Sequence, residues 1–202
     1  MKLYDSKNAP NPRRTRIFIS EKGLDIPTEE VDIGSLQTRT PEFLAKNPMG
    51  RVPVLELDDG SHIAESIAIC RYLEALHPDP PLFGTTPEEV ANVEMWVQRV
   101  EYNLAERVFG CFQNTHDYMK ERMEQVPAFG EVARKGAIDF LAVLDERLGR
   151  TKFIAGDRYT MADISAQMAI DFGKVVKIRI ADDQKNLQRW HVEVSVRPSA
   201  SA

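Results

Sequence analysis

The sequence predicts an α/β domain over residues 1–77 and an all-α helical domain over residues 88–202. Short strand-like and helix-like segments alternate in the first part, which is the pattern of an open α/β layer. Long apolar stripes at helical spacing fill the second part. Residues 78–87 carry prolines at 78, 80, 81 and 87, which prevent a continuous helix, so this stretch is the expected linker.

The first domain is expected to have the element order β-α-β-α-β-β-α. Strands are expected at 2–5, 28–32, 52–57 and 61–64. Asn11-Pro12 and Thr40-Pro41 each indicate a helix start, because Asn or Thr accepts hydrogen bonds from free backbone N–H groups and Pro suits the first turn. Glu65-Ser66 opens the last helix.

The second domain is expected to contain long helices at about 88–114 and 125–148, and a buried helix at 161–177. Thr160 and Asp163 have the spacing of a capping box at the start of the buried helix, with Asp in place of the usual Glu or Gln. These two residues are therefore interpreted as structural.

Composition excludes several classes of protein. A net charge of −5 disfavours a generic nucleic-acid-binding surface, and no apolar run reaches the roughly 18 residues of a membrane span. The first residues lack a stretch of signal-peptide character, so a cytoplasmic location is expected. Cys70 and Cys111 form no CxxC pair, and the four histidines lack metal-ligand spacing, so no metal site is expected.

Pro53 lies inside a run that otherwise has the character of a strand. Proline removes a donor from a sheet, so an ordinary trans proline at a strand edge is one interpretation. A cis Val52–Pro53 bond is the other. It would turn the backbone N–H and C=O of Val52 outward, where they could pair with a peptide ligand as an added strand does.

Two helix starts are candidate binding sites. Glu65 and Ser66 could together bind a zwitterionic α-amino-acid group, because a helix N-terminus attracts a carboxylate and Glu65 can accept from an ammonium. Asn11, at the start of the first helix, could hold a thiolate whose pKa the helix dipole lowers. The alternative is that Ser66 and Asn11 only cap their own helices. The charged run from Arg13 to Arg16 is interpreted as a solvated helix face or an interface.

Three segments together resemble the cytosolic glutathione transferase superfamily. They are Asn47-Pro48-Met49-Gly50-Arg51-Val52-Pro53-Val54-Leu55, Glu65-Ser66-Ile67-Ala68-Ile69-Cys70-Arg71-Tyr72-Leu73 and the segment from Phe153 to Ile164. The resemblance covers nearly the whole chain in the right order. It implies a thioredoxin-like N-terminal domain, an all-helical C-terminal domain, a homodimer and a cis proline at Pro53.

The resemblance also implies a binding site for glutathione as co-substrate. Val52, before Pro53, should pair its backbone with the cysteinyl part of glutathione. Glu65 and Ser66 should hold the γ-glutamyl end. Gln37 or Arg39 should reach the glycine carboxylate.

The chain departs from the family at the thiol-activating residue, which is a Tyr, Ser or Cys after the first strand. Asn11 stands where cysteine-type members carry Cys, and Ser6 and Tyr4 are the alternatives. Without a nucleophilic Cys, glutaredoxin-like chemistry is disfavoured. The electrophile is expected between the domains, against the first long helix, and its candidate lining residues are Phe109, Phe112 and His116, which could equally belong to the core.

Two functions remain open from the sequence. The first is a glutathione transferase that activates glutathione as thiolate for attack on small hydrophobic electrophiles or organic peroxides. The second is a binding or regulatory protein with the same fold and little or no catalysis, which the missing activating residue favours. Thiol activation of bound glutathione distinguishes the two.

Overall fold

A computed structural model describes residues 1–202 and divides into two compact units. The first unit comprises Met1–Leu82 together with Pro198–Ala202, and the second comprises Phe83–Arg197. The division falls inside the expected linker. The last five residues belong to the first unit, whereas the sequence assigned them to the helical domain.

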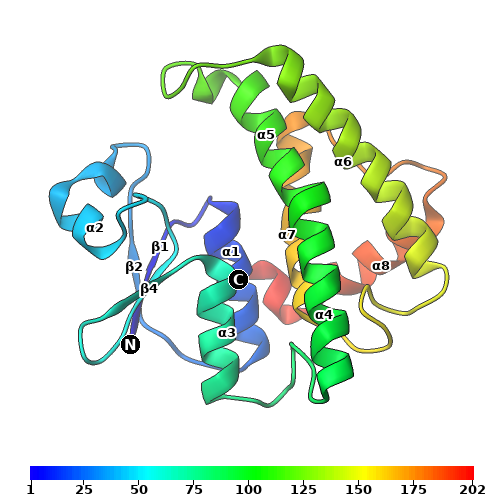
Figure 1. The fold of residues 1–202 in the computed structure, drawn as a ribbon, viewed down its shortest axis with the longest axis horizontal. Helices are drawn as coiled ribbons and strands as arrows, with labels where there is room; N and C mark the ends of the chain where they lie inside the picture. Colours follow the sequence, from blue (N-terminus) through cyan, green and yellow to red (C-terminus); the bar gives the residue numbers. More distant parts are fainter. The chain divides into compact units, whose positions relative to one another are not determined.

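The first unit contains a four-stranded mixed sheet of order β2-β1-β3-β4 (Figure 1). β1 pairs with β2 in parallel, whereas the pairs β1–β3 and β3–β4 are antiparallel. Its elements are β1 (Lys2–Asp5), α1 (Pro10–Glu21), β2 (Thr28–Glu30), η1 (Gln37–Arg39), α2 (Pro41–Lys46), β3 (Val54–Glu56), β4 (His62–Ala64) and α3 (Ser66–Leu76). The predicted order β-α-β-α-β-β-α is confirmed.

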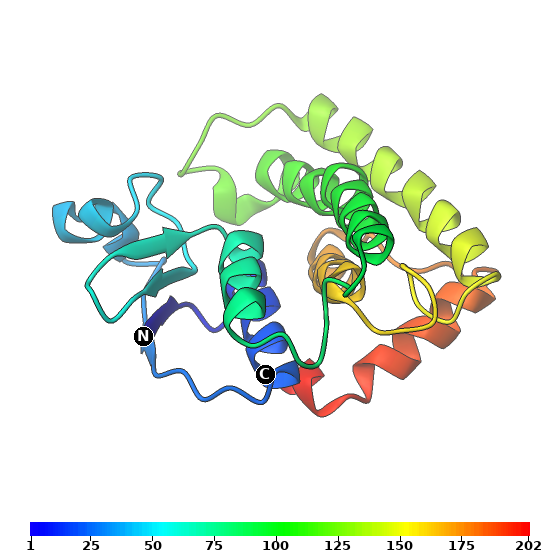
Figure 2. The same ribbon diagram turned by 60° about the horizontal axis from the view of Figure 1, so that its bottom comes forward.

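The helices α1 and α3 lie side by side on one face of the sheet, and α2 lies on the other (Figures 1 and 2). On the α2 side, an apolar cluster includes Tyr4 of β1, Phe43 of α2 and Val54 of β3, with Val31 and Val52 completing it. The rings of Tyr4 and Phe43 meet edge to face, with their centroids 6.2 Å apart. Burial on both faces therefore fixes the register of the sheet.

Two predicted helix caps are wrong. The helix α1 begins at Pro10 with Ala9 at the N-cap position and no side-chain cap, so Asn11 is the second helical residue. The N-cap of α3 is Glu65, and Ser66 is its first helical residue, so Ser66 does not cap this helix. Thr40 does cap α2, where its hydroxyl accepts from the N–H of Phe43 at 3.3 Å.

The second unit is almost entirely helical. Its elements are α4 (Pro87–Val100), the π-helical segment η2 (Glu101–Ala105), α5 (Glu106–Thr115), η3 (Asp117–Met119), α6 (Pro127–Leu148), α7 (Met161–Gly173), η4 (Lys174–Val176) and α8 (Lys185–Ser195). α4, η2 and α5 follow one another directly, so the expected helix at 88–114 contains a π segment that the apolar pattern does not reveal. No helix is both long and apolar enough to cross a membrane.

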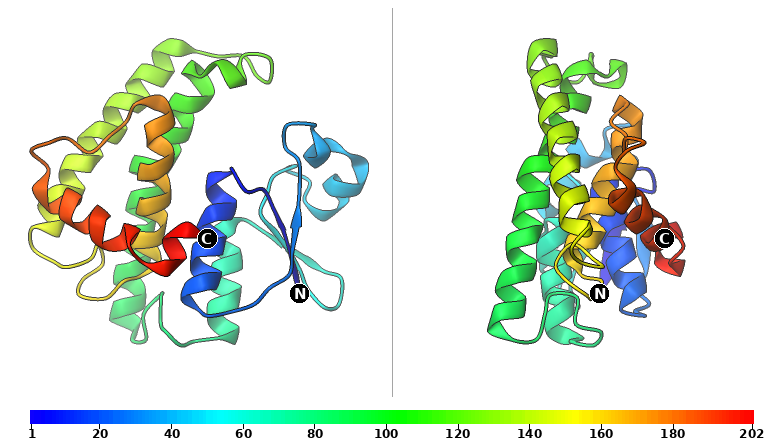
Figure 3. Two further views of the ribbon diagram at one scale, coloured as in Figure 1. Left: turned by 180° about the vertical axis from the view of Figure 1, so that it is seen from behind. Right: turned by 90° about the vertical axis from the view of Figure 1, so that its right-hand side faces the viewer.

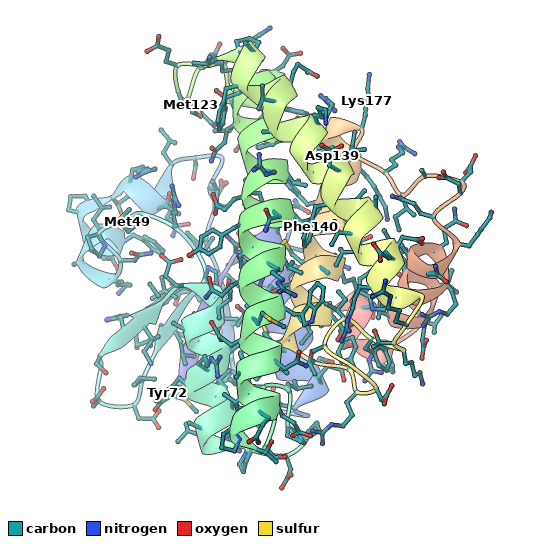
Figure 4. All side chains as sticks on the ribbon, turned by 45° about the vertical axis from the view of Figure 1, so that its right-hand side comes forward. Met49, Tyr72, Met123, Asp139, Phe140 and Lys177 are labelled. Atoms are coloured by element: carbon teal, nitrogen blue, oxygen red, sulfur yellow. The ribbon has the colours of Figure 1, made fainter.

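Helix α7 is buried along its length, and the capping box at its start is confirmed. The carboxylate of Asp163 accepts hydrogen bonds from the backbone N–H groups of Thr160 and Ile154 and from the indole N–H of Trp190. On α6, neighbouring residues face opposite environments (Figure 4): Phe140 is buried, while Asp139 is exposed.

The C-terminal residues form the short helix η5 (Pro198–Ser201), which packs on α1 (Figure 3). The guanidinium of Arg13 donates to the carbonyl of Ala200 at 3.1 Å, and Ser199 donates its hydroxyl to Glu21. These contacts hold the end of the chain against α1.

Candidate active site

The strand register brings three separate segments to one edge of the sheet. Tyr4 pairs with Val54, and Val54 pairs with Ala64. Because β1 and β4 run antiparallel to β3, the end of β1, the start of β3 and the end of β4 lie in one row. The loop before α1, the Val52–Pro53 bond and the Glu65–Ser66 junction therefore meet there, which is where open α/β layers bind ligands.

The Val52–Pro53 bond is cis, which confirms the expectation from the resemblance. In residues 1–202, neither the N–H nor the carbonyl of Val52 forms a hydrogen bond with the chain. The preceding turn is held by the side chain of Asn47, whose amide donates to the carbonyl of Arg51 at 2.8 Å and whose oxygen accepts from the N–H of Met49 at 3.1 Å. The Val52 backbone is thus available to an extended ligand.

The start of α3 combines strain with free donors. Glu65 has a φ of 67°. This backbone conformation costs a residue other than glycine about 1–3 kcal/mol, and residues that adopt it are concentrated at functional sites. The first intrahelical hydrogen bond runs from the N–H of Ile69 to the carbonyl of Glu65. The N–H groups of Ser66, Ile67 and Ala68 lie before it and have no partner within the helix. This helix end can bind a carboxylate.

A buried arginine lies behind this helix end. Arg14 of α1 is 2% exposed, and its Nη1 donates to the hydroxyl oxygen of Ser66 at 3.0 Å. The interpretation of residues 13–16 as a solvated face is therefore wrong. Arg14 lies one helical turn before the buried Phe18, so the apolar stripe of α1 was the signal that could have indicated its burial.

The start of α1 offers few donors, and all of them come from one residue. Pro10 and Pro12 have no N–H, and the N–H of Arg13 bonds to the carbonyl of Ala9 at 3.2 Å. The backbone N–H and the carboxamide of Asn11 have no partner within residues 1–202. Asn11 therefore supplies the donors that this helix end can direct at an anion.

Comparisons with known proteins now decide the family. The family models for the N-terminal and C-terminal domains of glutathione S-transferases match residues 9–76 and 106–198. Glutathione S-transferase 2 of Saccharomyces cerevisiae is 34% identical, over 98% of this chain and 87% of its own length.

The chain belongs to the glutathione S-transferase family.

Solved structures agree with this assignment. A glutathione S-transferase domain-containing protein from Marinobacter aquaeolei is 37% identical and superposes with a TM-score of 0.93, covering 98% of this chain and 99% of its own. Gtt2 from Saccharomyces cerevisiae is 33% identical, with a TM-score of 0.94 and 98% coverage of both chains. The predicted thioredoxin-like domain followed by a helical domain is confirmed, and the chain is a glutathione transferase by its relatives. Glutathione is the co-substrate of this family.

The two alternatives to Asn11 are already engaged. The hydroxyl of Tyr4 donates to Glu56 at 2.7 Å, and Glu56 stands at the end of β3 away from Pro53. This hydrogen bond also holds the pKa of the Glu56 carboxyl below its ordinary value. Ser6 is buried at the end of β1, and its hydroxyl lies 3.5 Å from Glu30.

The loop that carries Ser6 is fixed by a neighbouring ion pair. Arg16 Nη1 lies 2.7 Å from Asp5 Oδ1, and its Nη2 donates to the carbonyl of Lys7 at 2.9 Å. The segment from the end of β1 to the start of α1 is thereby tied to α1 itself.

The candidates for the glycine end of glutathione lie in η1, and both are exposed. The side-chain oxygen of Gln37 accepts from the N–H of Asp32 at 2.8 Å, which leaves its amide N–H groups as donors. The guanidinium of Arg39 donates to the carbonyl of Met49 at 3.4 Å. Met49 itself is 57% exposed on the loop after α2 (Figure 4). Arg39 thus links η1 to the loop that leads to Val52.

The three residues predicted to line the electrophile site lie on or next to α5, in the second unit. Phe109, Phe112 and His116 are half-buried and belong to one aromatic cluster around α5. The Phe109 and Phe112 rings lie 5.6 and 5.1 Å from Phe172, and the Phe112 ring lies 4.8 Å from His116. His116 Nδ1 accepts from the N–H of Tyr118. No group of three or more His, Cys, Asp or Glu side chains is arranged to hold a metal ion.

Proposed function

We propose that this chain binds glutathione in an extended conformation and stabilises its thiolate through Asn11, for attack on small hydrophobic electrophiles or organic peroxides. The observation that carries the proposal is the start of α1. Two prolines remove the competing N–H groups there, and both donors of Asn11 remain unpartnered. A thiolate needs few donors, and a helix N-terminus lowers the pKa of a nearby thiol.

The remaining contacts follow the edge of the sheet. The cysteinyl backbone of glutathione pairs with Val52, beside the cis bond to Pro53. The γ-glutamyl group has its carboxylate at the start of α3, at Ser66, and its ammonium at the carboxylate of Glu65. Its glycine carboxylate accepts hydrogen bonds from Gln37 or Arg39, the two exposed donors of η1.

The reaction itself is carried by glutathione. In conjugation, the thiolate forms a carbon–sulfur bond with the electrophile as the leaving group departs. In peroxide reduction, the thiolate attacks one peroxide oxygen and the O–O bond breaks. The alkoxide leaves and takes a proton from solvent to give the alcohol, and a second glutathione converts the sulfenic acid to the disulfide and water. Both routes begin with loss of the thiol proton to solvent, so they share the requirement for a lowered thiol pKa.

Ultraviolet absorbance of the thiolate, measured across pH with saturating glutathione, tests this proposal. Bound glutathione should have a thiol pKa one to two units below that of free glutathione, which is about 1.4–2.7 kcal/mol. Asn11→Ala keeps the backbone N–H but removes the carboxamide, so the pKa should rise by about one unit. Ser6→Ala and Tyr4→Phe are the matched controls and should leave the pKa of bound glutathione unchanged.

Binding without a pKa shift would contradict the proposal and favour the alternative of a binding or regulatory protein.

If the thiol pKa of bound glutathione is lowered, turnover of 1-chloro-2,4-dinitrobenzene and of cumene hydroperoxide distinguishes conjugation from peroxide reduction. Phe109, Phe112 and His116 remain the predicted lining for the electrophile. The homodimer and the cytoplasmic location also remain predictions.

A further inference from the structure

Arg14 is a full positive charge in the interior of the first unit. It is 2% exposed, and it is among the largest fully buried side chains of the chain. Burial of a charge is costly unless hydrogen bonds and opposite charges compensate for it. Its contact with Ser66 is the one that reaches the candidate glutathione site, since Nη1 donates to Ser66 Oγ at 3.0 Å.

This contact determines what Ser66 can do. A serine hydroxyl has one hydrogen to donate and two lone pairs that accept. A guanidinium has no acceptor, so the hydrogen bond with Arg14 must occupy a lone pair of Ser66 Oγ. The hydroxyl hydrogen of Ser66 is therefore directed away from Arg14 and remains available to an acceptor at the start of α3.

The surroundings favour an anion as that acceptor. The free N–H groups at the start of α3 already attract negative charge. The guanidinium adds a full charge behind them, in a region where burial reduces screening by water and salt. A neutral ligand group would gain little from this charge, whereas a carboxylate would gain much more.

We propose that Arg14 is a positioning residue for the α-carboxylate of the γ-glutamyl group: it orients the Ser66 hydroxyl toward that carboxylate and supplies the buried charge behind it. The inference rests on the proposed binding of glutathione. It assigns the selectivity of this end of the site to an arginine on α1 that acts through Ser66 of α3.

Calorimetric titration with two ligands tests the inference. The first ligand is glutathione, and the second is γ-aminobutyryl-cysteinylglycine, which lacks only the α-carboxylate. Arg14→Met should weaken glutathione binding about tenfold or more and change binding of the analogue less than twofold. In a Ser66→Ala background, Arg14→Met should cost glutathione affinity less than it does in the wild type.

A purely structural role for Arg14 predicts a different result. Loss of packing would weaken both ligands equally, and that outcome would overturn the inference, as would no effect on either ligand. If Arg14→Met does not unfold cooperatively, Arg14→Lys decides the question. It keeps the charge with fewer donors, so its loss should be smaller but still confined to glutathione, and equal losses would again overturn the inference.

The two proposals fail in different ways. A wild-type protein that binds neither ligand contradicts the proposed function and removes the basis of this inference. A wild-type protein that binds glutathione, with Arg14→Met weakening both ligands alike, refutes the role of Arg14 alone.

Discussion

Replacing Lys22 with methionine should destabilise the first unit strongly. The side chain of Lys22 is fully buried at the end of α1. Its Nζ lies 2.5 Å from Glu74 Oε2 on α3, and it donates to the carbonyls of His77 and Pro80 at 2.8 and 2.5 Å. One ammonium thus joins α1 to α3 and to the chain segment that follows α3.

The magnitude follows from what the substitution leaves behind. Removing one partner of a buried ion pair costs about 3–5 kcal/mol, because the other charge stays buried and loses the partner that offset its desolvation. The Glu74 side chain is 14% exposed, so water compensates in part and the lower end, about 3 kcal/mol, applies. In a chain of this size, each kcal/mol lowers Tm by about 2–4 °C, so Lys22→Met should lower it by about 6–12 °C.

Thermal unfolding followed by far-ultraviolet circular dichroism measures this change. Lys135→Met is the matched control, since Lys135 also pairs with a carboxylate but is 77% exposed, and its Tm should change little. Glu74→Gln added to Lys22→Met should recover part of the loss, because it removes the carboxylate charge that Lys22 no longer balances. A shift below 2 °C, or additive effects of the two substitutions, would refute the reasoning.

Two further predictions concern buried groups of both units. Cys70 and Cys111 are fully buried, and desolvation raises the pKa of the Cys70 thiol to about 12. The native protein should therefore not react with Ellman's reagent at pH 8, whereas two thiols should react in guanidinium, and rapid native labelling would contradict this burial. Asp163→Ala should cost about 3 kcal/mol or more, because it removes the cap of α7 and leaves buried donors without an acceptor. Urea unfolding tests this against the exposed control Asp157→Ala, and a loss below about 1 kcal/mol would count against it.

The element order and several helix starts could be predicted because their signals are local. A Thr-Pro pair, the spacing of Thr160 and Asp163, and the apolar stripes each lie within one element, and each matches the structure. Asn11-Pro12 predicted the wrong start for α1, because this signal is also purely local. A second proline at position 10 also suits the first turn, and the helix begins there instead.

Arg14 and the C-terminal residues could not be placed in this way. Arg14 donates to Ser66, which is 52 positions away in the sequence, and that contact exists only after α1 and α3 pack together. Ser199 likewise finds its partner Glu21 across 178 positions. A charged or polar side chain with such a distant partner is easily interpreted as solvated, because the sequence around it does not identify the partner. For Arg14, the apolar stripe of α1 could indicate burial but not the contact with Ser66.

The two helix N-termini at the candidate site differ in a way that matches two different anions. The start of α3 offers the N–H groups of three successive residues and the hydroxyl of Ser66, with Arg14 behind them. A carboxylate has two oxygens and accepts several hydrogen bonds at once. The start of α1 offers only Asn11, because Pro10 and Pro12 have no N–H to give. A thiolate sulfur accepts hydrogen bonds weakly and gains mainly from one or two well-placed donors and the helix dipole. The prolines around Asn11 therefore make α1 a poor carboxylate site and leave α3 as the better one, which supports the proposed orientation of glutathione, with its γ-glutamyl end at α3 and its sulfur at α1.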